Sequence, residues 1–154
     1  MNQLSREAVT NAFSKKQQKD LKIPDLDAID WKNIDYLGWI HRSGHLGYIV
    51  YEFDGKLIGI RLNVEKTLND NKYKICSLCL TQHLGNGTSL FTSPNPVRKN
   101  EVTGDYLCAN LNCGLYLRGI EKSEAIQLRE DITREQKIER YLKNLRRFII
   151  RSIT

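Results

Sequence analysis

Four cysteines are the residues of this 154-residue chain whose types and spacing most clearly predict chemistry. Cys76 and Cys79 are separated by two residues, Cys108 and Cys113 by four, and 28 residues lie between the two pairs. A turn with two thiolates two residues apart can direct both at one ion, and a second pair completes a tetrahedron with sulfur about 2.3 Å from zinc. Four thiolates leave no position open for water, so the spacing predicts one structural Zn²⁺ whose binding is coupled to folding.

Two other cysteine chemistries remain open at this point. A redox couple of Cys76 and Cys79 lacks the βαβ context of a thioredoxin-like site and leaves the second pair unexplained. An iron–sulfur cluster would use the same four thiolates, and sequence does not separate it from a zinc site. We favour zinc because the ligand spacing is of the structural-zinc type.

The three histidines predict no catalytic centre. His83 follows Cys79 by four residues, and we expect it to be solvated in a glycine-bearing loop rather than to replace a cysteine ligand. His41 and His45 flank a Ser-Gly turn, where no nucleophile and orienting carboxylate lie at a recognisable spacing. We therefore expect turn and surface histidines, and a chain that is not an enzyme.

Composition places the chain among ordinary globular domains, with 40% hydrophobic and 27% charged residues. No run approaches the roughly 20 apolar residues of a membrane span, and residues 1–12 lack the apolar core of a secretory signal. These features predict a cytoplasmic protein with no membrane contact. The formal charge of +6 favours an acidic partner, such as RNA, a ribosome surface or an acidic protein, without choosing among them.

The elements that would position the cysteines predict an α+β fold with an antiparallel β-sheet. Aromatic and β-branched residues alternate in the first half of the chain, where Asp54-Gly55 is a hairpin signal. Ile58, Ile60 and Leu62 share one face of the returning strand. A short helix follows Cys108 and ends near residue 119. The predicted strands are residues 38–42, 48–53, 57–62 and 89–93.

Helices are predicted at both ends of the chain. Residues 4–20 indicate one helix, which with an arm forms an N-terminal part over residues 1–28; residues 29–154 form the zinc-binding domain. Thr133 and Gln136 form a capping box that begins an amphipathic C-terminal helix. Residues 134–154 carry seven basic and two acidic residues, a net charge of +5 that would attract phosphates or an acidic protein surface.

Several stretches together resemble the C-terminal treble-clef zinc-finger domain of elongation factor G-binding proteins, a family that includes fusidic acid resistance proteins. The resemblance covers roughly residues 30–152. It rests on the ordered set GWIHRSG (38–44), YIVY (48–51), CSLC (76–79), LFTS (90–93), GDYLC (104–108) with its continuation to residue 119, and the basic helix at 138–149.

The resemblance implies a β-sheet beside a treble clef whose four cysteines bind zinc. It also implies binding of elongation factor G, with promotion of its release from the ribosome in the resistance proteins. Those proteins carry a substantial N-terminal helical bundle, whereas about one helix precedes the matched region here. Binding is attributed to the zinc domain, so we expect a monomeric elongation factor G-binding protein, with the ribosome or rRNA as a further partner.

Interface anchors tend to be aromatic residues and arginine. The candidate partner-binding residues are Phe91, Tyr116, Arg118, Arg147 and Phe148. Core packing is the alternative role of the two phenylalanines, and a solvated face that of the two arginines. The alternative function is a small RNA- or ribosome-binding zinc protein that uses the basic C-terminal helix.

Overall fold

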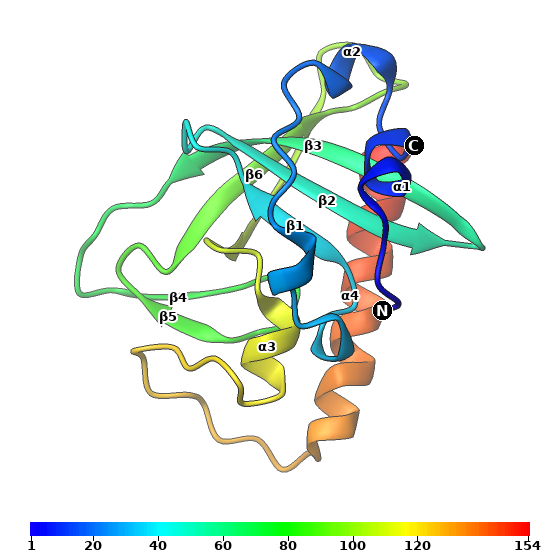
Figure 1. The fold of residues 1–154 in the computed structure, drawn as a ribbon. Coiled ribbons are helices and arrows are strands. Elements are labelled where there is room, and N and C mark those ends of the chain that lie inside the picture. The colour runs from blue at the N-terminus through cyan, green and yellow to red at the C-terminus, as the bar shows by residue number, and fades with distance from the viewer.

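A five-stranded antiparallel sheet organises the computed structural model, which describes residues 1–154 (Figure 1). The strand order is β1-β2-β3-β6-β7, so the three strands of the meander lie on one side and the β6–β7 hairpin on the other. The strands are β1 (Leu37–Ile40), β2 (Leu46–Phe53), β3 (Lys56–Lys66), β6 (Thr88–Pro94) and β7 (Val102–Cys108).

The predicted meander is confirmed, and its turn explains the register. Asp54 and Gly55 both have positive φ, at 49° and 78°, as the tight hairpin turn that suits the strand twist requires. Ile49 consequently pairs with Ile60 on one face of the sheet. β3 extends past the predicted end at residue 62 because its second half pairs with β6, for example Val64 with Phe91.

A separate two-stranded hairpin, β4 (Tyr73–Ile75) and β5 (Gln82–Leu84), encloses the first cysteine pair. The glycine-bearing loop expected around His83 is in part a strand, because residues 82–84 form β5. A three-residue strand gives too short a pattern to read, and here pairing of Lys74 with His83 forms it. The predicted short helix is present as α3 (Cys113–Leu117).

One face of the large sheet is covered by α4 (Arg134–Ile153). Its capping box is confirmed: the Gln136 N–H donates to Thr133 Oγ1 over 3.1 Å and the Thr133 N–H donates to Gln136 Oε1 over 2.9 Å. The buried stripe of the helix joins sheet residues and the four cysteines in one hydrophobic core. The stripe consists of Tyr141, Leu145, Phe148 and Ile149.

The predicted single helix over residues 4–20 is wrong. The structure has two short helices, α1 (Arg6–Asn11) and α2 (Lys15–Gln18), followed by two 3₁₀ turns, η1 (Leu26–Ala28) and η2 (Trp31–Asn33). Ser14 separates the helices because its hydroxyl accepts from the Gln17 N–H while the Gln17 side chain accepts from the Ser14 N–H. That reciprocal cap starts a new helix at this point.

The N-terminal segment packs on the face of the sheet opposite to α4. Phe13 lies edge-on to Trp39 and Tyr48, with ring centroids 6.1 and 5.7 Å away, inside a second buried cluster. The Gly59 N–H of β3 also donates to the Ala12 carbonyl over 2.9 Å. Residues 1–28 are therefore docked on the sheet, and the boundary at residue 28 stays a prediction.

Gly59 allows this docking because the Phe13 ring lies directly on the strand. A Cβ at Gly59 would lie 2.6 Å from Phe13 Cδ1, too close without a shift of the ring. We expect Gly59→Ala to lower the free energy of unfolding by about 1–3 kcal/mol, as overpacking does. Urea denaturation measures the change. In a Phe13→Leu background the cost should shrink; an unchanged midpoint for Gly59→Ala alone would contradict the docking.

Candidate metal centre

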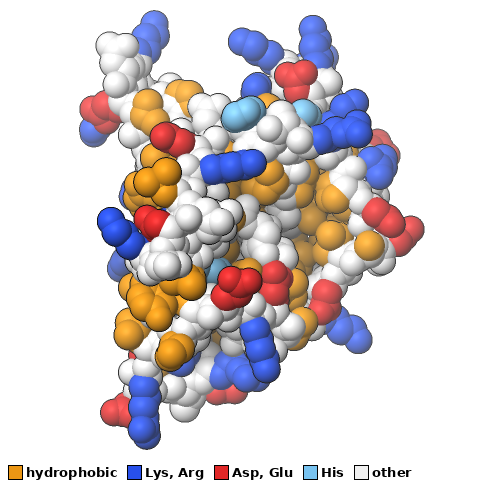
Figure 2. Space-filling view, turned by 90° about the vertical axis from the view of Figure 1, so that its left-hand side faces the viewer, with side chains coloured by type: hydrophobic (Ala, Val, Ile, Leu, Met, Phe, Trp, Pro, Cys, Tyr) orange, Lys and Arg blue, Asp and Glu red, His pale blue; other side chains and the backbone are white.

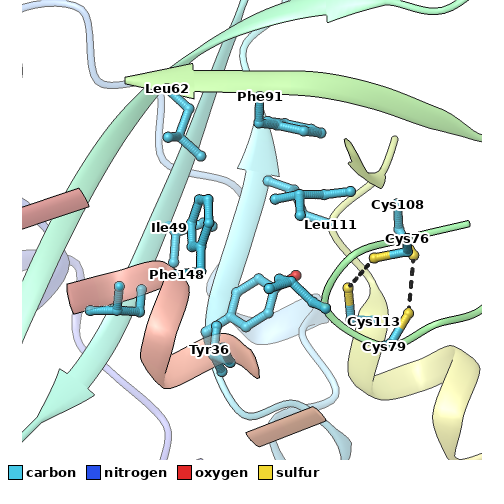
Figure 3. Close-up of a cluster of buried hydrophobic side chains, with 14 of the residues drawn as sticks. Tyr36, Ile49, Leu62, Cys76, Cys79, Phe91, Cys108, Leu111, Cys113 and Phe148 are labelled. Atoms are coloured by element: carbon cyan, nitrogen blue, oxygen red, sulfur yellow. Dashed lines mark hydrogen bonds between the residues drawn. The ribbon is translucent and has the colours of Figure 1, made fainter. Parts of the chain in front are cut away.

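The four cysteines that the sequence predicts as ligands converge on one point (Figure 3). Their four Sγ atoms all lie within 4.8 Å of one another, and each residue is at most 3% exposed. Cys76 Sγ is 3.7 Å from Cys113 Sγ, and Cys79 Sγ is 3.5 Å from Cys108 Sγ. These separations exclude disulfides, whose sulfurs lie about 2.05 Å apart.

The cluster has the composition and spacing of a structural zinc site. Thiolates at the corners of a tetrahedron around zinc, each about 2.3 Å from the metal, lie about 3.8 Å from one another. The observed separations of 3.5 and 3.7 Å are close to that spacing. Zinc bound here would link its four ligands and supply folding energy, with no coordination position left for a substrate.

Three local structures position the ligands. Cys76 and Cys79 flank a tight turn in which the Leu80 N–H donates to the Cys76 carbonyl over 2.9 Å. The Ser77 N–H donates to the Tyr106 carbonyl over 2.8 Å, which holds this turn against β7. Cys108 ends β7 and Cys113 begins α3. A knuckle, a β-hairpin and the start of a helix therefore supply the ligands together.

His83 lies beside the cluster and is not one of its ligands. Its Nε2 is 3.2 Å from Cys108 Sγ and its side chain is 3% exposed, so the expectation of a solvated loop histidine is wrong. The glycine at position 87 makes the space, because a Cβ there would lie 2.7–2.9 Å from His83 atoms. Burial lowers the pKa of His83, which keeps its ring neutral.

Two tyrosine hydroxyls are also buried here without a hydrogen-bond partner, those of Tyr36 and Tyr141. Burial raises the pKa of both phenols, and Cys113 is the neighbouring group that raises each pKa most after burial. Both side chains therefore keep their protons near the cysteine cluster. No pattern in the sequence singles out these tyrosines, because their distance from Cys113 in the chain hides the contact.

The predicted anchors Tyr116 and Arg118 make internal contacts. The Tyr116 hydroxyl accepts from Asn110 Nδ2 over 3.0 Å, and its ring lies edge-on to His83 with centroids 5.0 Å apart. Arg118 forms a two-pronged ion pair with Asp35, at 2.9 and 3.1 Å, and donates to the Asn33 carbonyl over 3.0 Å. Arg118 therefore ties the segment before β1 to α3.

Phe91 and Phe148 are 0% and 1% exposed, respectively, within the core between sheet and α4. A side chain without exposed area cannot contact a partner, so we remove both phenylalanines from the predicted contact surface. Arg147 is exposed and makes no ion pair within the chain, which leaves it available. His41 lies in the β1–β2 turn with its Nδ1 3.0 Å from Ser43 Oγ, and His45 is exposed there, as expected.

This combination of a zinc-type knuckle, a hairpin and a helix that begins with a ligand defines a treble-clef zinc finger beside an antiparallel sheet. The chain belongs to the FBP C-terminal treble-clef zinc-finger family, whose model matches residues 5–152. The match includes the docked N-terminal helices, which precede the region that the sequence motifs covered.

Among solved structures, that of the fusidic acid resistance protein FusC is similar, with a TM-score of 0.67 and 25% sequence identity. The alignment covers 99% of this chain and 60% of the FusC chain, so the chain spans about three fifths of that protein. Comparison with curated protein sequences finds no significant match. No helix of the structure is long and apolar enough to cross a membrane.

Proposed function

We propose that this chain is a zinc-stabilised binding module that associates with elongation factor G and promotes its release from the ribosome. The observation that carries the proposal is the family match over residues 5–152, supported by 25% identity to a fusidic acid resistance protein. The four-thiolate centre favours a binding role over an enzymatic one, because such a centre has no position for a reacting group.

A groove beside the zinc knuckle, lined by four hydrophobic and six polar or charged residues, is the contact surface that we propose. It encloses about 600 Å³ between the end of β3, β4 and the β6–β7 hairpin. Leu68, Ile75 and Tyr106 line it while remaining 78%, 44% and 48% exposed. Figure 2 shows the side of the molecule that carries β4 and β5, where hydrophobic side chains form patches among charged ones. Exposed patches of this kind mark interaction sites.

A basic hollow continues from the groove. It encloses about 420 Å³, shares Ser77 with the groove and is lined by Arg147 and Arg151 of α4. Arg151 is paired with Asp105 over 2.6 Å, whereas Arg147 is free to meet a carboxylate of the partner. An apolar centre with a charged margin is the usual anatomy of a protein–protein interface.

Charge pairing on α4 favours a protein partner over RNA. Five of the seven basic residues in this segment form ion pairs with acidic residues of the same chain. A phosphate-binding stripe needs free cations, and here Arg134 and Arg147 alone of the seven have no ion pair. The five paired residues are Lys137, Arg140, Lys143, Arg146 and Arg151.

Calorimetry and size exclusion with purified elongation factor G, without ribosomes, test the proposal. We expect a one-to-one complex. Tyr106→Ala should weaken it by about 2 kcal/mol, roughly thirtyfold in Kd, because truncating an aromatic anchor has that effect. Arg147→Glu should slow association and reduce its salt dependence. Ile120→Ala and Arg42→Glu are matched controls, since both residues are exposed and line neither hollow.

Two results would count against the proposal. No heat and no co-eluting complex would refute direct binding of the factor. Recovery of RNA alone from nuclease-free lysate, lost on nuclease treatment, would instead support the RNA-binding alternative.

A further inference from the structure

The zinc centre of this fold is a buried negative charge. Zn²⁺ with four thiolates carries a net charge of −2, and the four cysteines are at most 3% exposed within a hydrophobic core. A buried charge is costly unless hydrogen-bond donors surround it. The side chains that lie next to the sulfurs therefore decide how stable the metal-bound state is.

His83 is one such donor, and the fold fixes its ring. Nε2 lies 3.2 Å from Cys108 Sγ, within hydrogen-bonding distance for sulfur. The edge of the ring meets Tyr116, whose hydroxyl is held by Asn110, and Asn110 in turn donates to Glu121 over 2.6 Å. These contacts support the imidazole on the side that faces Tyr116.

Tyr36 is a second candidate donor beside the cluster. Its ring is seated against Gly38 and Leu111: a Cβ built at Gly38 would lie 2.7 Å from the Tyr36 ring and 2.8 Å from Leu111. Figure 3 shows the ring beside the cysteines, with its hydroxyl directed toward them. That hydroxyl is buried and has no hydrogen-bond partner, and Cys113 is the neighbouring group that raises its pKa most after burial. An unpaired buried hydroxyl is a net cost in an ordinary core.

We propose that His83 and Tyr36 donate hydrogen bonds to the zinc-bound thiolates of Cys108 and Cys113, respectively, and so hold the metal in place. Thr81 would be a third donor: in the structure the Cys79 thiol donates to the Thr81 hydroxyl over 3.2 Å, and this bond reverses when Cys79 is a thiolate. The otherwise unpaired Tyr36 hydroxyl then has a hydrogen-bond acceptor, the Cys113 thiolate of the zinc-bound state. Neither residue is a metal ligand; each positions and stabilises a ligand sulfur.

Tyr36→Phe tests the proposal most cleanly because it removes only the hydroxyl. Zinc affinity is measured on the whole protein by competition with a chelator series at fixed pH. We expect it to fall about tenfold or more, the range found when partners of metal ligands are removed. In cobalt-substituted protein the sulfur-to-metal charge-transfer band should move to lower energy, because the thiolate loses a hydrogen bond. Tyr48→Phe is the matched control, as the Tyr48 hydroxyl donates to the Asp20 carbonyl on the other face of the sheet.

The role of His83 is tested by two variants that separate the effect of its hydrogen-bond donor from the effect of its side-chain volume. Glutamine places an amide N–H near the position of Nε2, so His83→Gln should keep most of the zinc affinity. Leucine fills similar space without a donor, so His83→Leu should lose zinc faster and react faster with an alkylating agent. If His83→Leu does not fold, the Tyr36→Phe result decides. Wild-type zinc affinity and an unchanged cobalt band in Tyr36→Phe, with a raised melting temperature, would overturn the proposal.

Discussion

Replacing Cys113 with alanine is expected to leave the protein without a stable fold at ordinary temperatures, so that heating shows no cooperative unfolding transition. Structural zinc contributes about 10–16 kcal/mol of binding free energy in small zinc domains, which is as large as the whole stability of a typical domain, about 5–15 kcal/mol. Cys113 joins the start of α3 to the core that the sheet and α4 share. Losing this ligand therefore removes the free energy of zinc binding from the main core of the protein rather than from a peripheral segment.

Elemental analysis and thermal melting by circular dichroism measure this effect together. We expect one zinc per chain in the native protein, substoichiometric zinc in Cys113→Ala, and the same loss of structure when a strong chelator removes the metal. Ser77→Ala is the matched control because Ser77 lies in the same knuckle and is exposed. Iron with visible absorption, or a normal melt for Cys113→Ala, would contradict a structural zinc centre.

The ligand set and the meander could be predicted from sequence because their signals are local. A two-residue spacing between thiolates, a hairpin dipeptide and a capping box each depend on residues a few positions apart. Asp54-Gly55 sets the register of two strands, and Thr133 sets the start of α4. Local chemistry of this kind leaves few alternatives for the chain to adopt.

The surroundings of the metal could not be predicted, because they depend on contacts between distant parts of the chain. His83 meets Cys108 across 25 positions, and Arg118 meets Asp35 across 83. In each case a polar residue, which its type alone would place in solvent, is held inside the protein by a contact with a residue that is distant in the sequence. The same reasoning explains why a basic helix with a net charge of +5 presents few free cations.

Neighbouring residues on α4 show how far burial outweighs residue type. Arg147 and Phe148 were both predicted to be anchors, yet consecutive positions on a helix point about 100° apart. The structure directs Phe148 into the core, 1% exposed, and leaves Arg147 exposed at the basic hollow. The apolar stripe predicts which side of the helix is buried, but not which of its edges a partner can reach.

Phe148→Ala should therefore lower stability, whereas Arg147→Ala should affect binding. Phe148 packs in the core with Leu145, Ile149 and the cysteines, so its truncation should cost about 3–5 kcal/mol of unfolding free energy. For a chain of this length that corresponds to a fall in melting temperature of roughly 6–20 °C. Arg147→Ala should melt normally and slow association with the proposed partner, elongation factor G, since Arg147 has no ion-pair partner within the chain.

Measuring melting and binding on both variants separates a core role from a contact role. Below its lowered melting temperature, the folded fraction of Phe148→Ala should bind with native affinity, because Phe148 is 1% exposed and lines neither the groove nor the basic hollow. A Phe148→Ala protein that melts normally but binds weakly would place this side chain at the interface and reverse its assignment to the core. An Arg147→Ala protein that binds at the native rate would remove the basic hollow from the contact surface. The groove beside the zinc knuckle would then have to account for recognition by itself, which the Tyr106→Ala measurement decides.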